Sequence, residues 1–183
     1  MRGEPITLQQ VFNLAWQAFI VEGKPPAIEN GQCTYRVSRI GDEDPALRAC
    51  SKCAIGLALA DDQLDILTER CVDDLPVDTI IGMFPQWFQS AEEHWQTSLD
   101  SKVDSSLFRR HSGFGFSYSG SIVRDVFRDA QCSLHDYCLD PMDSSKFVSP
   151  DSLRRAYIAF ANRYKLTIPE ESDVNKNNAS ASV

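Results

Sequence analysis

Cysteine and histidine side chains occur in two pairs whose spacing suits a metal ion. Cys50 and Cys53 are separated by two residues, and the same separation holds between Cys132 and His135. Each pair can supply two ligands to a tetrahedral zinc ion, because zinc in proteins prefers thiolate sulfur and imidazole nitrogen. Four such ligands would make the site structural. The alternative is that a chain with six cysteines reaches this spacing by chance.

The same segments allow a second chemistry, in which a thiol acts as a nucleophile. Cys53 would attack, His135 would accept its proton, and Asp136 or another carboxylate would orient the imidazole. If Cys53 opens a helix, the helix dipole and the neighbouring Lys52 would both favour the thiolate. Neighbouring residues do not face each other on a helix, so Asp136 is poorly placed to orient His135. The alternative is a buried thiol, because the sequence around Cys53 is apolar and cysteine is often buried.

His135 and Asp136 also form the doublet of the helical, metal-dependent phosphohydrolases called HD proteins. Such a site needs a further histidine, for which His94 and His111 are candidates, and a later aspartate, for which Asp151 is available. Together they would bind a divalent metal that activates water. The doublet is common by chance, and His111 lies in a glycine-rich stretch that does not favour a helix.

Amphipathic patterns predict the helices that would position these side chains. In chain order, the expected helices cover residues 7–22, 53–59 running on into 61–70, 78–89, 90–110, 121–137 and 149–164. Thr7 to Gln10 has the form of a capping box, and Ser149 is a capping serine with Pro150 at the first turn. Pro85 must kink or split the helix that contains it, because proline lacks an amide hydrogen.

The remaining segments predict little β structure. Asn30-Gly31 is a strong turn signal, and the β-forming residues that follow predict a short β element near residues 32–39. The glycine-rich segment 111–120 is expected to form a loop or a short hairpin. Residues 170–183 are polar and without period, so they are expected to be disordered. We therefore expect a mainly α fold, α+β at most, with one compact helical domain over residues 1–169.

Composition restricts the kind of partner. With 26 acidic and 18 basic residues, the net charge of −8 does not favour nucleic acid as the partner. The charge is uneven, because residues 41–106 hold 14 acidic and 4 basic side chains whereas residues 107–169 hold 9 basic and 6 acidic ones. The simplest interpretation is that solvated helix faces of opposite charge attract one another across the fold.

The aromatic residues offer a further possibility. Phe84, Trp87, Phe88 and Trp95 could form a groove for a partner, although their helical spacing favours core packing.

Several short motifs resemble a group of small bacterial and phage proteins for which no activity is established. The resemblance rests on an amphipathic helix from Leu8 to Phe19, Cys33 to Arg36, Lys52 to Gly56 with an acidic pair near Asp61, and Leu134-His135-Asp136. It covers about two thirds of the chain, and the segment from Cys71 to Gly120 carries none of it. The resemblance implies no function, but it directs attention to Cys33, Cys53, His135 and Asp136.

The absence of a complete catalytic signature, together with the polarised charge, favours a non-catalytic accessory or regulatory protein that binds another macromolecule, with a protein as the expected partner. The alternatives are a small cysteine-dependent hydrolase using Cys53 and His135, and a zinc-stabilised domain; no other cofactor is expected. The longest apolar run, Cys53 to Ala60, is far below the roughly 20 residues that cross a bilayer, so no membrane association is expected. The N-terminus shows no secretory pattern, which predicts a cytoplasmic location and reduced cysteines.

Overall fold

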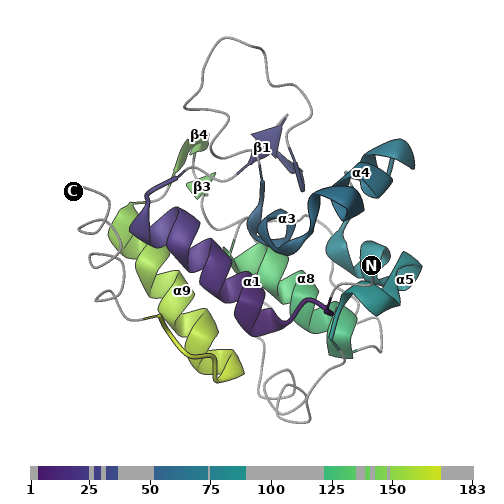
Figure 1. Cartoon of the computed structure of the whole chain (residues 1–183). Coiled ribbons are helices and arrows are strands. Elements are labelled where there is room, and N and C mark those ends of the chain that lie inside the picture. The colour runs from purple at the N-terminus through teal and green to yellow at the C-terminus, as the bar shows by residue number, and fades with distance from the viewer. Residues whose placement is uncertain are drawn as a thin grey trace, which may run out of the picture.

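The computed structural model is mainly helical, as the sequence predicts (Figure 1). It describes residues 4–24, 27–29, 32–36, 52–73, 75–89, 122–134, 139–140, 143–147 and 149–169. Six α-helices lie within these residues, and the strands are few and short. The predictions for residues 90–110, 111–120 and 170–183 lie outside the described part of the chain.

The helices and strands follow one another in this order along the chain. The helices are α1 (Leu8–Ala15), the π-helix η1 (Trp16–Val21), α3 (Ala54–Ala58), α4 (Asp61–Glu69), α5 (Val77–Met83), the 3-10 helix η2 (Pro85–Trp87), α8 (Ile122–Leu134) and α9 (Pro150–Tyr164). The strands are β1 (Ile28–Glu29), β2 (Gln32–Cys33), β3 (Leu139–Asp140) and β4 (Asp143–Phe147). They form two antiparallel pairs, β1 with β2 and β3 with β4.

The first predicted helix is confirmed, but its second half is a π-helix. The Thr7 side chain caps α1 by accepting a hydrogen bond from the Gln10 amide at 3.0 Å. From Trp16 onward the backbone widens, so that the Glu22 amide donates to the Gln17 carbonyl at 3.0 Å, five residues earlier. Gly23 ends the helix with φ at +64°, a conformation that glycine adopts without strain.

The apolar segment after Lys52 is helical, as predicted, but it forms two helices. Leu59 has an extended backbone (ψ 135°), which ends α3 after five residues. The chain restarts as α4, where the Gln63 side chain accepts a hydrogen bond from the Ala60 amide at 2.9 Å. Asp61 and Asp62 stand in the first turn of α4, where the helix dipole favours negative charge.

Both proline predictions are confirmed. α5 ends at Met83, and Pro85 begins the separate turn η2, because proline cannot donate the next helical hydrogen bond. Ser149 caps α9 by accepting from the Ser152 amide at 3.3 Å, with Pro150 in the first turn. At its other end, α9 stops at Lys165, whose φ of +53° is left-handed.

The β element is shorter than predicted in the described residues. Only Gln32 and Cys33 form β2, which pairs antiparallel with β1. Arg36 then forms an isolated antiparallel bridge with Lys52, just ahead of α3.

The core lies where α1, α3, α8 and α9 meet (Figure 1). Rings from α1 and α9 meet in it, where the Phe12 ring centroid lies 6.4 Å from that of Phe160 and 6.0 Å from that of Tyr157. α5 packs against α8 on the other side, where the Phe88 ring meets the edge of Phe127 at 5.0 Å. Among the described residues, no helix is both long enough and apolar enough to span a membrane.

Candidate functional site

Cys53 lies directly before α3 and is fully buried. Cys53 is therefore the residue that caps the start of α3. Its sulfur accepts a hydrogen bond from the Gly56 amide at 3.4 Å, so the thiol caps the helix from within the core. A substrate could reach this sulfur only if the core opened.

Cys132, the second described member of the predicted zinc set, lies on α8 and is half-buried. It neighbours Arg128, one helical turn earlier, which also pairs with Asp78 of α5. Burial alone would lower the pKa of Arg128, but Asp78 and Cys132 outweigh it and hold that pKa above its ordinary value. The guanidinium therefore stays charged while it joins α8 to α5.

The other members of the predicted sites, Cys50, His135 and Asp136, lie outside the described residues, as do His94 and His111. Asp151 is exposed in the first turn of α9. Among the described residues, no three histidine, cysteine or acidic side chains lie close enough together to hold a metal ion. The zinc site, the Cys53–His135 pair and the HD site each require a residue outside this part and stay predictions.

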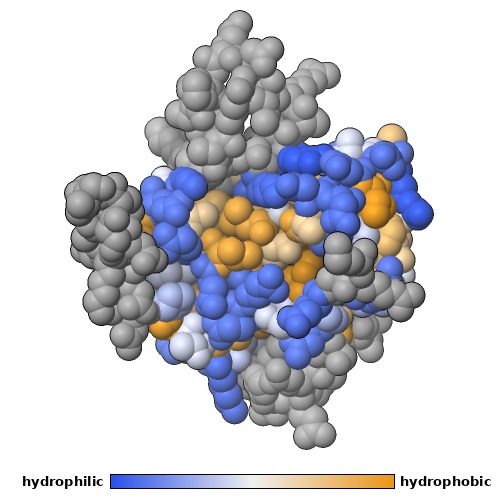
Figure 2. All heavy atoms as spheres, in the orientation of Figure 1, coloured by the Kyte–Doolittle hydropathy of each residue, from blue (hydrophilic) through white to orange (hydrophobic). Residues whose placement is uncertain are grey.

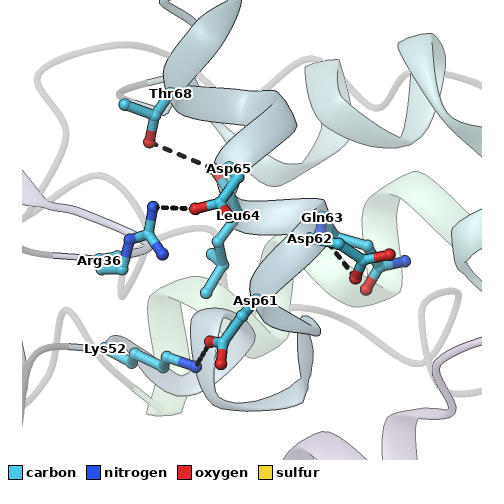
Figure 3. A network of polar contacts seen from close by, with 8 residues as sticks. All are labelled: Arg36, Lys52, Asp61, Asp62, Gln63, Leu64, Asp65 and Thr68. Atoms are coloured by element: carbon cyan, nitrogen blue, oxygen red, sulfur yellow. Dashed lines mark hydrogen bonds and ion pairs between the residues drawn. The ribbon is translucent and has the colours of Figure 1, made fainter.

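The structure brings together two of the motifs that are separate in sequence. Arg36 and Lys52 face each other across the antiparallel bridge, and each cation pairs with a carboxylate of α4 (Figure 3). Arg36 donates to Asp65 at 2.7 Å, and the Lys52 ammonium lies 2.9 Å from Asp61. The hydrogen bond from Lys52 and its charge hold the pKa of Asp61 below its ordinary value.

A close backbone contact between Gly56 and Tyr35 also joins these two motifs. A Cβ atom placed on Gly56 would lie 2.0 Å from the Tyr35 carbonyl oxygen, so only glycine allows this approach. The Tyr35 side chain is buried and donates a hydrogen bond from its hydroxyl to the Leu75 carbonyl at 2.9 Å. The segments Cys33–Arg36 and Lys52–Gly56 thus pack closely together and hold α3 and α4 in position.

A buried polar network between α8 and α9 was not predicted from the sequence. The Asp129 side chain is 5% exposed and accepts hydrogen bonds from Arg163 at 2.8 Å, Tyr164 at 2.6 Å and Ser133 at 2.9 Å. Burial and the charge of Asp129 raise the pKa of the Tyr164 phenol above its usual value of 10.0. The sequence did carry one signal of this network, because Asp129 is a carboxylate directly before Ala130 of the apolar stripe.

Charges of the acidic middle segment do meet the C-terminal helices. Asp78 of α5 pairs with Arg128 of α8, and Gln131 accepts a hydrogen bond from the Val77 amide at 3.0 Å. The second contact satisfies the Val77 amide, one of the first amides of α5, which have no partner within the helix. The attraction that the charge distribution predicts across the fold is present at this interface.

The comparisons with known proteins add no relationship. No protein-family model, curated protein or solved structure matches this chain. The functional argument therefore rests on the geometry of the described residues.

Hydrophobic side chains also lie on the surface. Figure 2 shows a hydrophobic area in the middle of the visible face, where Figure 1 places α1 and α3, with hydrophilic residues around it. Leu14 of α1 is 37% exposed, and Leu57 and Ala58 of α3 are half-buried. We call Leu14, Leu57 and Ala58 the α1–α3 surface.

The predicted aromatic cluster divides between core and surface. Phe84 and Phe88 are buried, as core packing predicts, whereas Trp87 is half-buried. Trp95 lies outside the described residues.

Proposed function

We propose that this protein is a non-catalytic accessory or regulatory protein that binds another protein through the α1–α3 surface. The observation that carries this proposal is the hydrophobic area with a polar surround over α1 and α3 (Figure 2). These two helices pack together and carry the exposed Leu14 and the half-buried Leu57 and Ala58. Water leaves such a surface favourably when a partner covers it. A hydrophobic patch with a polar rim is typical of a protein-binding site.

The position of Cys53 supports binding over thiol catalysis. Its sulfur is buried and already serves as a hydrogen-bond acceptor for α3, whereas a nucleophilic thiol needs access to substrate. The carboxylates of Asp65 and Asp61 on α4 form ion pairs with Arg36 and Lys52 of this chain. They therefore join elements of the fold, which also supports a non-catalytic role. We propose a cytoplasmic location, where the exposed thiol of Cys71 would stay reduced.

Site-directed photocrosslinking tests this function. A photoreactive amino acid replaces Leu14 in cells, and the matched control carries it at Asp151, which is exposed on α9. We expect a discrete protein to be crosslinked from position 14 and not from position 151. The captured protein is then purified, and its affinity for the wild-type chain and for Leu14→Glu is measured by calorimetry.

Leu14→Glu is expected to weaken the complex at least tenfold, because a carboxylate buried against apolar surface loses its hydration. Asn13→Glu adds the same charge at the neighbouring exposed position and should leave the affinity within about twofold. Circular dichroism confirms that both variants are folded. Equal crosslinking from both positions, or a complex that Leu14→Glu does not weaken, would contradict the proposal.

A further inference from the structure

A second surface combines aromatic, apolar and cationic side chains at the end of α5, on the outer edge of the helical body (Figure 1). Phe84 and Trp87 stack with ring centroids 4.1 Å apart and planes within 5° of parallel. Met83 beside them is 42% exposed, the highest value among the large hydrophobic residues that the structure describes. Phe84 is itself buried, so the groups that a partner could reach are the half-buried Trp87 ring and the exposed Met83 thioether.

Two arginines border these side chains. The Arg70 guanidinium lies over the Phe84 ring, 5.3 Å from its centroid. Arg124 of α8 lies against Gly82, where a Cβ atom would be only 2.9 Å from its terminal nitrogen. We call Arg70, Met83, Phe84, Trp87 and Arg124 the α5 platform.

The two arginines differ from others in the described part of the chain. Arg36, Arg128 and Arg163 each hold a carboxylate of a neighbouring element. Arg70 and Arg124 pair with no carboxylate among the described residues, although the chain has 26 acidic side chains. Their donors can therefore bind an external acidic group without first breaking an ion pair with a described carboxylate.

We propose that the α5 platform binds an acidic protein segment that carries an apolar side chain. Arginine recognises carboxylates through paired hydrogen bonds, and Trp, Met and Arg are enriched at the centres of protein interfaces. The apolar side chain would cover Met83 and Trp87, while flanking carboxylates would reach the guanidiniums. A nucleic acid suits the platform less well, because two arginines offer far fewer cationic contacts than the several phosphates that a nucleic-acid site neutralises.

This surface goes beyond the proposed function, because it shares no residue with the α1–α3 surface. The test is a selection of random twelve-residue peptides displayed on phage, with the wild-type chain as the immobilised target. We expect the selected peptides to contain aspartate or glutamate on either side of a large apolar residue. Their affinities are then measured by fluorescence anisotropy with the synthetic peptides.

Arg124→Glu and Arg70→Gln are each expected to weaken the acidic peptides at least tenfold. Glutamate at position 124 suits the first turn of α8, so the fold should be kept. Arg155→Glu removes an exposed arginine on α9 and should change the affinity by less than twofold. Binding should also weaken with added salt, which screens exposed charges.

Four results would overturn the proposal that the α5 platform binds an acidic segment. They are no enrichment of peptides, enrichment without acidic residues, equal weakening by Arg155→Glu, and tighter binding of a single-stranded oligonucleotide than of the selected peptides. Peptides weakened by Leu14→Glu but not by Arg124→Glu would also overturn it, while supporting the α1–α3 surface. Failure of the platform is therefore distinguishable from failure of the proposed function.

Discussion

At the scale of single residues, Gly56 has the tightest requirement. Gly56→Ala would push a methyl group into the Tyr35 carbonyl, which is backbone and cannot rotate away. We expect the free energy of unfolding to fall by at least about 2 kcal/mol, as for other overpacked sites. Urea denaturation measures this change.

Gly82 provides the matched control. Its added methyl group would meet only the end of the flexible Arg124 side chain. Alanine also favours a helix over glycine, so Gly82→Ala should be neutral or stabilising by up to about 1 kcal/mol. If the Gly56→Ala variant were as stable as the Gly82→Ala variant, the close contact between Gly56 and the Tyr35 carbonyl would be contradicted.

At the scale of elements, Asp129 joins α8 to α9. Asp129→Ala would remove the carboxylate that accepts hydrogen bonds from Arg163, Tyr164 and Ser133. Because the buried Tyr164 and Ser133 hydroxyls would lose their acceptor, we expect a loss of about 2–4 kcal/mol in the free energy of unfolding. Asp65→Ala removes the ion pair with Arg36. Because the Asp65 carboxylate is 59% exposed, the free energy of unfolding should fall by less than about 1 kcal/mol. Similar losses in the two variants, measured by urea denaturation, would contradict the burial of this network.

The same network predicts a dependence of stability on alkaline pH. Burial and Asp129 raise the pKa of Tyr164 in the folded chain, whereas an unfolded tyrosine loses its proton near pH 10. Above about pH 10 the unfolded state therefore binds fewer protons, and stability falls as the pH rises, by at most about 1.4 kcal/mol per pH unit from this group. Below that pH the contribution is fully present.

Tyr164→Phe isolates this effect. We compare its urea unfolding with that of the wild-type chain at about pH 8 and about pH 11. The free energy of unfolding should fall less in the variant, because the phenol that titrates differently in the two states is absent. Parallel declines in the two proteins would show that Tyr164 does not titrate differently in the folded state.

At the scale of the whole molecule, the packing between helices predicts cooperative unfolding. α8 contacts α1, α3, α5 and α9, so that no described helix of the core can leave without exposing apolar surface on α8. We expect tryptophan fluorescence and far-ultraviolet circular dichroism to report one coincident transition in urea. Two separated transitions would mean that the chain divides into independent units.

Local signals in the sequence were sufficient to predict much of the helical structure. Thr7, Ser149 and Pro85 act through their own backbone and nearest neighbours, so the helix limits they set were visible without a fold. The break at Leu59 was not predicted, because an apolar run has the same pattern in one buried helix as in two.

The sequence by itself determined the helical class, the caps and the apolar faces, because these depend on periodicity and on contacts a few residues apart. Only the tertiary structure decided that Cys53 is a buried cap, that Gly56 meets Tyr35, and that Asp129 receives Arg163 and Tyr164. Each of these contacts joins residues whose meeting depends on how the helices pack. Packing also decided which arginines hold a carboxylate of their own chain and which, beside Met83 and Trp87, hold none among the described residues.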